Sequence, residues 1–140
     1  MITANVFRRT FFIRFKNSTG TAFTIDVEKK QYLVTARHVC IGVGDDDKIG
    51  IFHDGQFEEM TVKVVGLGST DEIDTDVAVF ALENQISPSF PMVATSEGLV
   101  WGQDVYFLGF PYGLHTSVGV KWWISLASCQ TSADVGKRWK

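Results

Sequence analysis

Apolar and polar residues alternate over much of the first 110 positions, with the period of two that is typical of half-buried strands. The alternation predicts short strands at residues 11–15, 23–27 and 32–36, around Val62 and Val64, and around Val105 and Phe107. In the second of these segments, for example, Phe23 and Ile25 alternate with Thr24 and Asp26. Residues 77–82 instead form a continuous apolar run, which predicts a strand buried on both faces.

Turn-forming residues separate these segments. Residues 17–20 end the first strand, the polar residues 28–31 predict a hairpin loop, and Gly109 and Pro111 end the strand around Phe107. No stretch of 12 or more residues carries a helical stripe, apart from a turn or two after His38. Short strands about 8–12 residues apart are typical of a sandwich or barrel. We therefore expect an all-β fold, specifically a closed antiparallel barrel.

The 140 residues contain 13 Lys and Arg against 16 Asp and Glu, a net charge of −3, and 45% are hydrophobic. This balance argues against nucleic-acid and membrane-surface partners. The longest apolar run, residues 77–82, is far shorter than the roughly 20 residues that cross a bilayer. Arg8, Arg9 and Arg14 interrupt the apolar stretch near the N-terminus, which does not resemble an export signal, so we expect a cytoplasmic protein.

Cysteine and histidine positions limit the chemistry. Cys40 and Cys129 match no redox or zinc-binding spacing, so we expect two free buried thiols, with one disulfide as the alternative. No two of the histidines have metal-ligand spacing, so we expect no zinc site. His53 lies in a turn-like segment and His115 in a polar loop, and these positions explain both residues.

His38 is placed differently, because it follows directly on the strand predicted at 32–36. A general-base imidazole needs a rigid mount and a carboxylate that holds its tautomer. Asp76, at the start of the apolar run, is the candidate carboxylate. A charge buried alone at the end of such a strand costs several kcal/mol, so we expect it to have a partner, and His38 is one candidate. The alternative is that both residues lie in unconnected, solvated loops.

Four segments occur in an informative order: Gly20 to Phe23, Tyr32 to Val39, Asp76 to Val79, and Gly102 to Val105 followed by Leu108 to Gly113. In that order they resemble the trypsin-like (chymotrypsin-fold) serine peptidases, especially the compact bacterial type, across about residues 6–114. The resemblance implies a six-stranded first β-barrel over residues 1–98 and an incomplete second barrel over 99–140. It also implies a serine endopeptidase acting on a peptide or protein without a cofactor, with His38 as the base and Asp76 as its orienting carboxylate.

The chain departs from this family at the nucleophile, because no serine after Asp76 lies in a Gly-x-Ser-Gly context. Cys129 has no neighbouring glycine either. From about Ser117 the sequence no longer resembles the family, and residues 121–124 show no strand-like rhythm. We therefore expect a complete first barrel and the opening strands of a second, truncated before the serine and inactive alone. An exposed inter-barrel face would then favour self-association and low stability.

Two other functions stay open at this point. The chain is either a protease-like barrel without catalytic activity that binds a peptide or partner protein, or a small all-β structural or capsid-associated protein. In the last case the pairing of His38 with Asp76 would be accidental.

Overall fold

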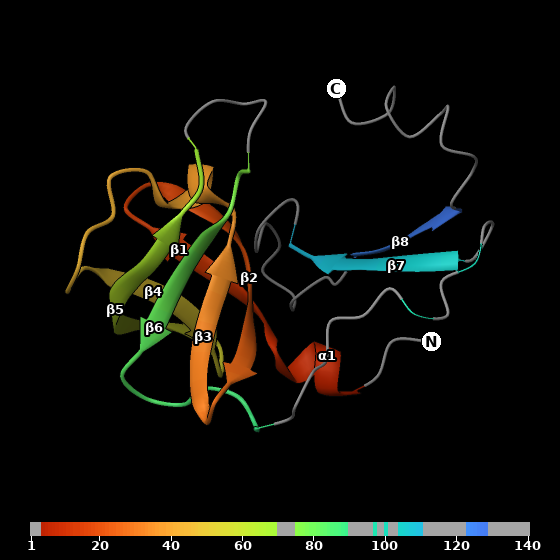
Figure 1. Cartoon of the computed structure of the whole chain (residues 1–140), viewed down its shortest axis with the longest axis horizontal. Helices are drawn as coiled ribbons and strands as arrows, with labels where there is room; N and C mark the ends of the chain where they lie inside the picture. Colours follow the sequence, from red (N-terminus) through yellow and green to blue (C-terminus); the bar gives the residue numbers. More distant parts are fainter. Residues whose placement is uncertain are drawn as a thin grey trace.

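The structure is a computed structural model that describes residues 4–69, 75–89, 97, 100, 104–110 and 123–128, with 104–107 and 123–128 described through their backbone. It consists mainly of strands (Figure 1). A short helix, α1 (Ala4–Arg8), precedes them, and a 3-10 helix, η1 (Arg37–Cys40), follows the third strand. The strands are β1 (Thr10–Phe15), β2 (Ser18–Val27), β3 (Lys30–Thr35), β4 (Lys48–His53), β5 (Gln56–Leu67), β6 (Ala78–Leu82), β7 (Asp104–Gly109) and β8 (Trp123–Ser128).

Six strands close into an antiparallel barrel in the order β1-β2-β3-β6-β5-β4, which confirms the expected all-β barrel. The barrel closes where β1 pairs with β4, through Ile13 with Ile51 and Arg14 with Gly50. Hairpins join neighbouring strands except at two places: at the closure between β1 and β4, and between β3 and β6, which pair across the intervening β4–β5 hairpin. This non-sequential pairing determines which loops meet at each end of the barrel.

Strands β7 and β8 form a separate two-stranded antiparallel sheet beside the barrel (Figure 1). Although the sequence shows no strand-like rhythm at residues 121–124, β8 begins at Trp123. The domain boundary at residue 98 and the incomplete second barrel stay predictions. No helix among the described residues is both long and apolar enough to span a membrane.

The sequence alternation located the second half of β2 but implied the wrong buried face, and residues 18–20, which were expected in a turn, begin the strand. Thr24 is fully buried inside the barrel, whereas Phe23 is 43% exposed on the outside. In β6 one face is buried and the other is not, since Phe80 is fully buried but Val79 is only half-buried. The prediction that residues 77–82 are buried on both faces is therefore wrong, because the barrel is a single layer whose outer side faces solvent.

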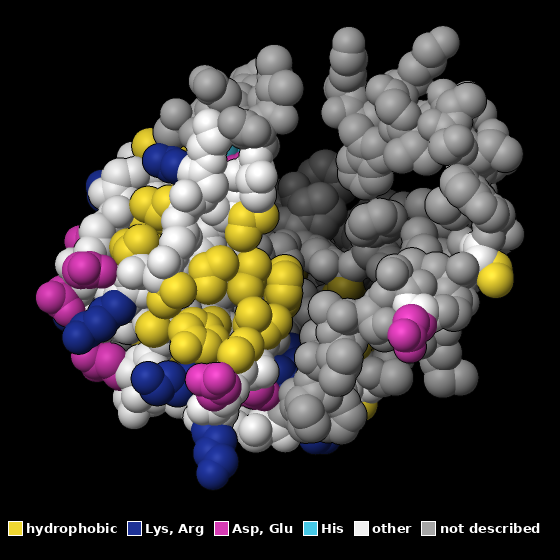
Figure 2. Space-filling view, in the orientation of Figure 1, with side chains coloured by type: hydrophobic (Ala, Val, Ile, Leu, Met, Phe, Trp, Pro, Cys, Tyr) yellow, Lys and Arg dark blue, Asp and Glu magenta, His cyan; other side chains and the backbone are white. Residues whose placement is uncertain are grey.

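The outward apolar residues of β2, β3 and β6 lie side by side in two rows, which we call the outer apolar rows. Cross-strand pairing aligns Phe23, Val34 and Val79 in one row and Ile25, Tyr32 and Ala81 in the other. Figure 2 shows the apolar area over this part of the barrel.

The core fills the barrel interior and extends to η1. Ile13, Leu33, Ile49, Val62 and Phe80 are all fully buried there. Cys40 is a free, buried thiol of this core, as expected, and Cys129 lies outside the described residues. Burial raises the pKa of the Cys40 thiol to about 11, since the thiolate would lose its hydration.

Candidate active site

His38 is carried by η1, which the core anchors at the end of β3. The next two residues, Val39 and Cys40, are buried, while the His38 side chain is 70% exposed. Val39 packs directly over Gly20 of β2, where a Cβ atom would lie 2.6 Å from a Val39 methyl carbon. A glycine at position 20 is therefore needed for η1 to lie this close to the barrel, and this contact fixes the backbone that carries His38.

Asp76 lies two residues before β6, in a segment that hydrogen-bonds to Gly68 at the end of β5. The Gly68 amide donates to the carbonyl of Val77 at 2.7 Å, and the Val77 amide donates to that of Thr75 at 3.0 Å. A side chain at position 68 would collide with the Thr75 backbone, so a glycine is needed here as well. The entry to β6 is thus held in place, and with it the carboxylate.

The pairing of β3 with β6 brings these two segments together, because Thr35 at the end of β3 lies opposite Ala78 at the start of β6. His38 Nδ1 lies 2.5 Å from Asp76 Oδ2, and the His38 backbone amide donates to Oδ1 at 2.9 Å. The pair is not buried as the sequence argument assumed: the Asp76 side chain is 46% exposed. The two hydrogen bonds therefore account for the pairing of Asp76 with His38, and the desolvation of a buried carboxylate does not.

The contact determines the charge on Asp76 and the tautomer of neutral His38. The side-chain hydrogen bond with His38 is the main cause that holds the pKa of Asp76 below its ordinary value of 3.8. Asp76 is therefore ionised at neutral pH and accepts hydrogen bonds only, so Nδ1 of neutral His38 must carry the proton. The lone pair of Nε2 is then available, and no described residue hydrogen-bonds to this atom. An imidazole held in this way can accept a proton at Nε2.

The other histidines are placed differently. His53 ends β4, and its Nδ1 lies 3.3 Å from Oδ2 of the adjacent Asp54. Asp54 and Gly55 form the turn to β5 with positive φ angles of 45° and 86°, and the Asp54 side chain is 86% exposed. His53 and Asp54 therefore form a local turn contact. Among the described contacts, Asp54 does not also accept the backbone amide of its histidine, as Asp76 accepts that of His38. His115 lies outside the described residues.

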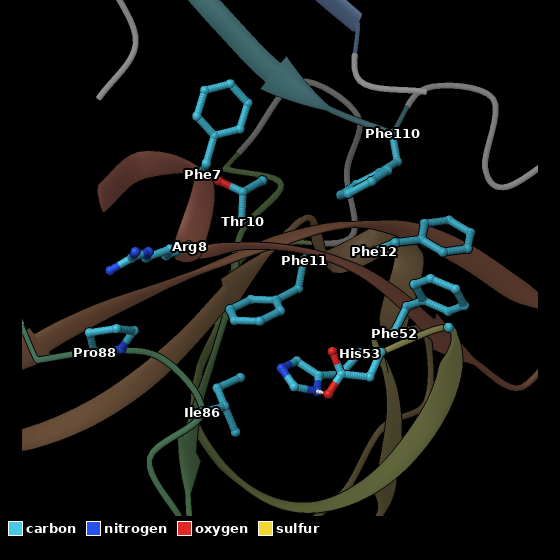
Figure 3. A pocket seen from close by; sticks show the side chains of 12 residues that line it. Phe7, Arg8, Thr10, Phe11, Phe12, Phe52, His53, Ile86, Pro88 and Phe110 are labelled. Atoms are coloured by element: carbon cyan, nitrogen blue, oxygen red, sulfur yellow. Dashed lines mark ion pairs between the residues drawn. The ribbon is translucent and has the colours of Figure 1, made fainter. Parts of the chain in front are cut away.

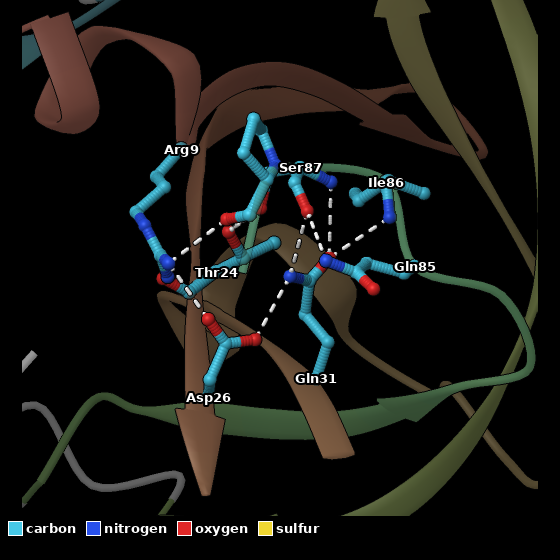
Figure 4. Close-up of polar contacts among 8 residues, drawn as sticks. Arg9, Thr24, Asp26, Gln31, Gln85, Ile86 and Ser87 are labelled. Atoms are coloured by element: carbon cyan, nitrogen blue, oxygen red, sulfur yellow. Dashed lines mark hydrogen bonds and ion pairs between the residues drawn. The ribbon is translucent and has the colours of Figure 1, made fainter. Parts of the chain in front are cut away.

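Ser87 belongs to a buried polar network that sequence reasoning did not find (Figure 4). Its hydroxyl lies 2.6 Å from that of Thr24, and both side chains are buried. Arg9, only 2% exposed, contacts Asp26 at 2.7 Å, and Gln31 donates to the other oxygen of Asp26 at 3.0 Å. Polar residues in an alternating segment predict a solvated face, so no sequence signal marked these side chains as buried. Ser87 therefore has a structural role.

The structure also contains an aromatic cavity of about 400 Å³ between α1, β1 and the β4–β5 turn (Figure 3). Five phenylalanines line it: Phe7, Phe11, Phe12, Phe52 and Phe110. Neither His38 nor Asp76 lines this cavity. The aromatic cavity is therefore separate from the candidate catalytic pair.

A family model, described as the trypsin-like peptidase domain, matches residues 20–137. No curated protein matches the chain. The match includes Gly20, His38 and Asp76 and continues past Ser117, so the resemblance extends further into the C-terminal part than the sequence motifs indicated. It covers most of the 140 residues. The chain therefore belongs to the trypsin-like peptidase family.

Proposed function

We propose that the chain supplies the His/Asp part of a serine endopeptidase, with His38 as general base and Asp76 as its orienting carboxylate. One observation carries the proposal: Asp76 contacts both the ring Nδ1 and the backbone amide of His38. Two contacts from one carboxylate fix the ring's position as well as its tautomer, as a general base requires. Membership of the trypsin-like peptidase family adds independent support.

In the proposed reaction a serine hydroxyl attacks the peptide carbonyl and transfers its proton to Nε2 of His38. Ionised Asp76 stabilises the resulting imidazolium, which then protonates the amine as the C–N bond breaks. Water hydrolyses the acyl-enzyme by the same route, with Nε2 again accepting and returning the proton. The printed sequence contains no serine in a Gly-x-Ser-Gly context. We propose that the nucleophile and the oxyanion donors come from polypeptide outside these 140 residues, and that these residues alone are inactive.

The test is covalent labelling with a fluorophosphonate, a probe that reacts with activated serines. The 140-residue chain and the product of the same gene extended past Lys140 are labelled in parallel. We expect label on a serine of the extended product and none on the shorter chain. His38→Ala should abolish the labelling, and Asp76→Asn should slow it by a factor of up to about 10⁴, the loss known when a triad aspartate becomes asparagine.

His53→Ala is the matched control, because His53 is also exposed and also contacts an aspartate. It should leave labelling unchanged. Equal labelling of the wild type and of His38→Ala would refute the proposal. So would an extended gene product without a serine that the probe can label.

A second candidate function, a barrel that binds a partner, is favoured by the outer apolar rows. Phe23 is 43% exposed, and its row continues through the half-buried Val34 and Val79. The barrel is closed, so an added strand cannot pair with an edge here, and a partner must contact side chains. We propose that the partner is a second copy of this chain.

The charges at the border of the rows support a second copy as the partner. Lys63 lies beside Ala81, and Lys30 lies beside Val27. Exposed Glu28 and Glu83 follow β2 and β6 at the same end of the barrel. A border that carries both signs can place opposite charges against each other when two copies meet about a two-fold axis.

Sedimentation velocity over a range of concentrations tests this interface. We expect a monomer–dimer equilibrium that Phe23→Thr shifts at least tenfold toward the monomer, since the side chain is deleted from both subunits. Ile41→Thr is the control, because Ile41 is 71% exposed but lies outside the rows. A wild-type chain that stays monomeric at all concentrations excludes self-association through this face.

A further inference from the structure

Thr21 of β2 hydrogen-bonds to two segments that are far from it in the sequence. Its carbonyl oxygen accepts from the Thr35 hydroxyl at 2.8 Å, at the end of β3 just before η1. Its own Oγ1 accepts from the Phe110 backbone amide at 2.7 Å, at the residue that follows β7. One residue thus links the segment leading to His38 with the end of the second sheet.

The end of β7 fits closely against Thr21. A Cβ atom at Gly109 would lie 3.1 Å from Thr21 Oγ1, closer than most side-chain contacts allow. Phe110 is only 7% exposed, and its ring centroid lies 5.4 Å from that of Phe12 on β1. The contact therefore combines a side chain-to-backbone hydrogen bond, a tight glycine and a buried aromatic pair.

We propose that Thr21 is a positioning residue that fixes the end of β7 on the barrel relative to η1. The β1–β2 pairing holds Thr21 opposite Phe12, so the Thr21 hydroxyl and the Phe12 ring contact Phe110 from neighbouring strands. If the second sheet leads to the nucleophile, Thr21 sets the distance from that nucleophile to His38. This consequence rests on the proposed function, whereas the docking of β7 does not.

Thr21→Val and Thr21→Ser form the matched pair of variants. Valine keeps the branched shape but cannot accept the Phe110 amide, whereas serine keeps the hydroxyl. We expect hydrogen exchange of the Phe110 amide to be at least about tenfold faster in Thr21→Val and close to wild type in Thr21→Ser. The Val62 amide, which donates to Asp47 at 3.0 Å within the barrel, should exchange at the wild-type rate in both.

Residual dipolar couplings measure the positioning directly. In the wild type and in Thr21→Ser, a single alignment tensor should fit the amides of β7 and of the barrel together. In Thr21→Val the β7 amides should depart from the barrel's tensor while the barrel amides still fit it. A loss of stability alone would not change the orientation of β7 in the folded molecules.

Gly109→Ala tests the same contact from the other side, without altering the barrel. It should crowd Thr21 Oγ1 and speed exchange at Phe110 as Thr21→Val does. Wild-type exchange and a shared tensor in both Thr21→Val and Gly109→Ala would overturn the proposal. Because neither readout requires peptidase activity, failure of fluorophosphonate labelling would leave this result unaffected.

Discussion

Asp76 contacts His38 at two atoms, with Oδ2 lying 2.5 Å from the ring Nδ1 and Oδ1 accepting the backbone amide at 2.9 Å. The residues are 38 positions apart in the sequence and meet because β6 pairs with β3. The carboxylate thus orients the ring relative to the backbone of η1, which the core holds in place.

The first prediction concerns the tautomer of His38. With ionised Asp76 as acceptor, neutral His38 carries its proton on Nδ1. Asp76→Asn offers an amide donor at the same place, which favours the tautomer protonated at Nε2. In Asp76→Asn the protonated-type ¹⁵N chemical shift should therefore move from Nδ1 to Nε2 of His38. The ring ¹⁵N shifts of His53 should not change. An identical His38 pattern in both proteins would show that Asp76 does not set the tautomer.

The second prediction concerns the titration of Asp76. His38→Ala removes the main cause of the lowered pKa, so the pKa of Asp76 should rise toward 3.8 in a ¹³C-detected titration. A carboxyl with a pKa lowered by folding stabilises the native state above its unfolded pKa. That stabilisation is lost as the pH falls through the folded pKa. Urea unfolding below about pH 4 should therefore depend less on pH in His38→Ala than in the wild type or in the His53→Ala control.

The third prediction concerns Cys40, whose burial keeps the thiol protonated. In Cys129→Ser, which leaves Cys40 as the single thiol, Ellman's reagent should react slowly at pH 8 in buffer and rapidly in denaturant. Because folding raises this pKa, the native state should lose stability as the pH rises from 9.0 toward about 11. Cys129→Ser/Cys40→Ala should lack that loss. Rapid labelling of the folded protein would contradict the buried position.

The fourth prediction concerns the buried ion pair between Arg9 and Asp26 (Figure 4). Arg9→Met removes the guanidinium that also donates to the Pro88 carbonyl at 2.9 Å, and should lower the free energy of unfolding by about 3–5 kcal/mol. The double variant Arg9→Met/Asp26→Leu should recover part of this loss, because it also removes the buried carboxylate.

Arg14 provides the matched surface control in urea unfolding. Its contact with Glu59 is 3.6 Å long, and both side chains are about half exposed. Arg14→Met should therefore change stability by no more than about 1 kcal/mol. Equal losses in the free energy of unfolding for Arg9→Met and Arg14→Met would show that the buried ion pair stabilises the fold no more than the exposed one.

The sequence alternation predicted most of the barrel strands but missed β4 entirely. In β4, Ile49, Gly50 and Ile51 are buried in succession, because Gly50 lies between Arg14 of β1 and Glu59 and Phe57 of β5. A glycine in a tightly packed position breaks the alternating pattern. Strand β8 was missed because its alternation is short: only Ile124 and Leu126 alternate with Ser125, and two tryptophans in succession precede them.

By itself the sequence determined that the chain forms an all-β barrel, because strand periodicity and turn residues are local properties. It also singled out His38 and Asp76, by residue type and by their positions beside predicted strands. Only the tertiary structure decided that Thr24 and Asp26 turn inward while Phe23 and Ile25 turn outward, and that Asp76 reaches His38. These features depend on strand register and on the pairing of β3 with β6. Both are set by packing between residues far apart in the chain, which a local pattern does not encode.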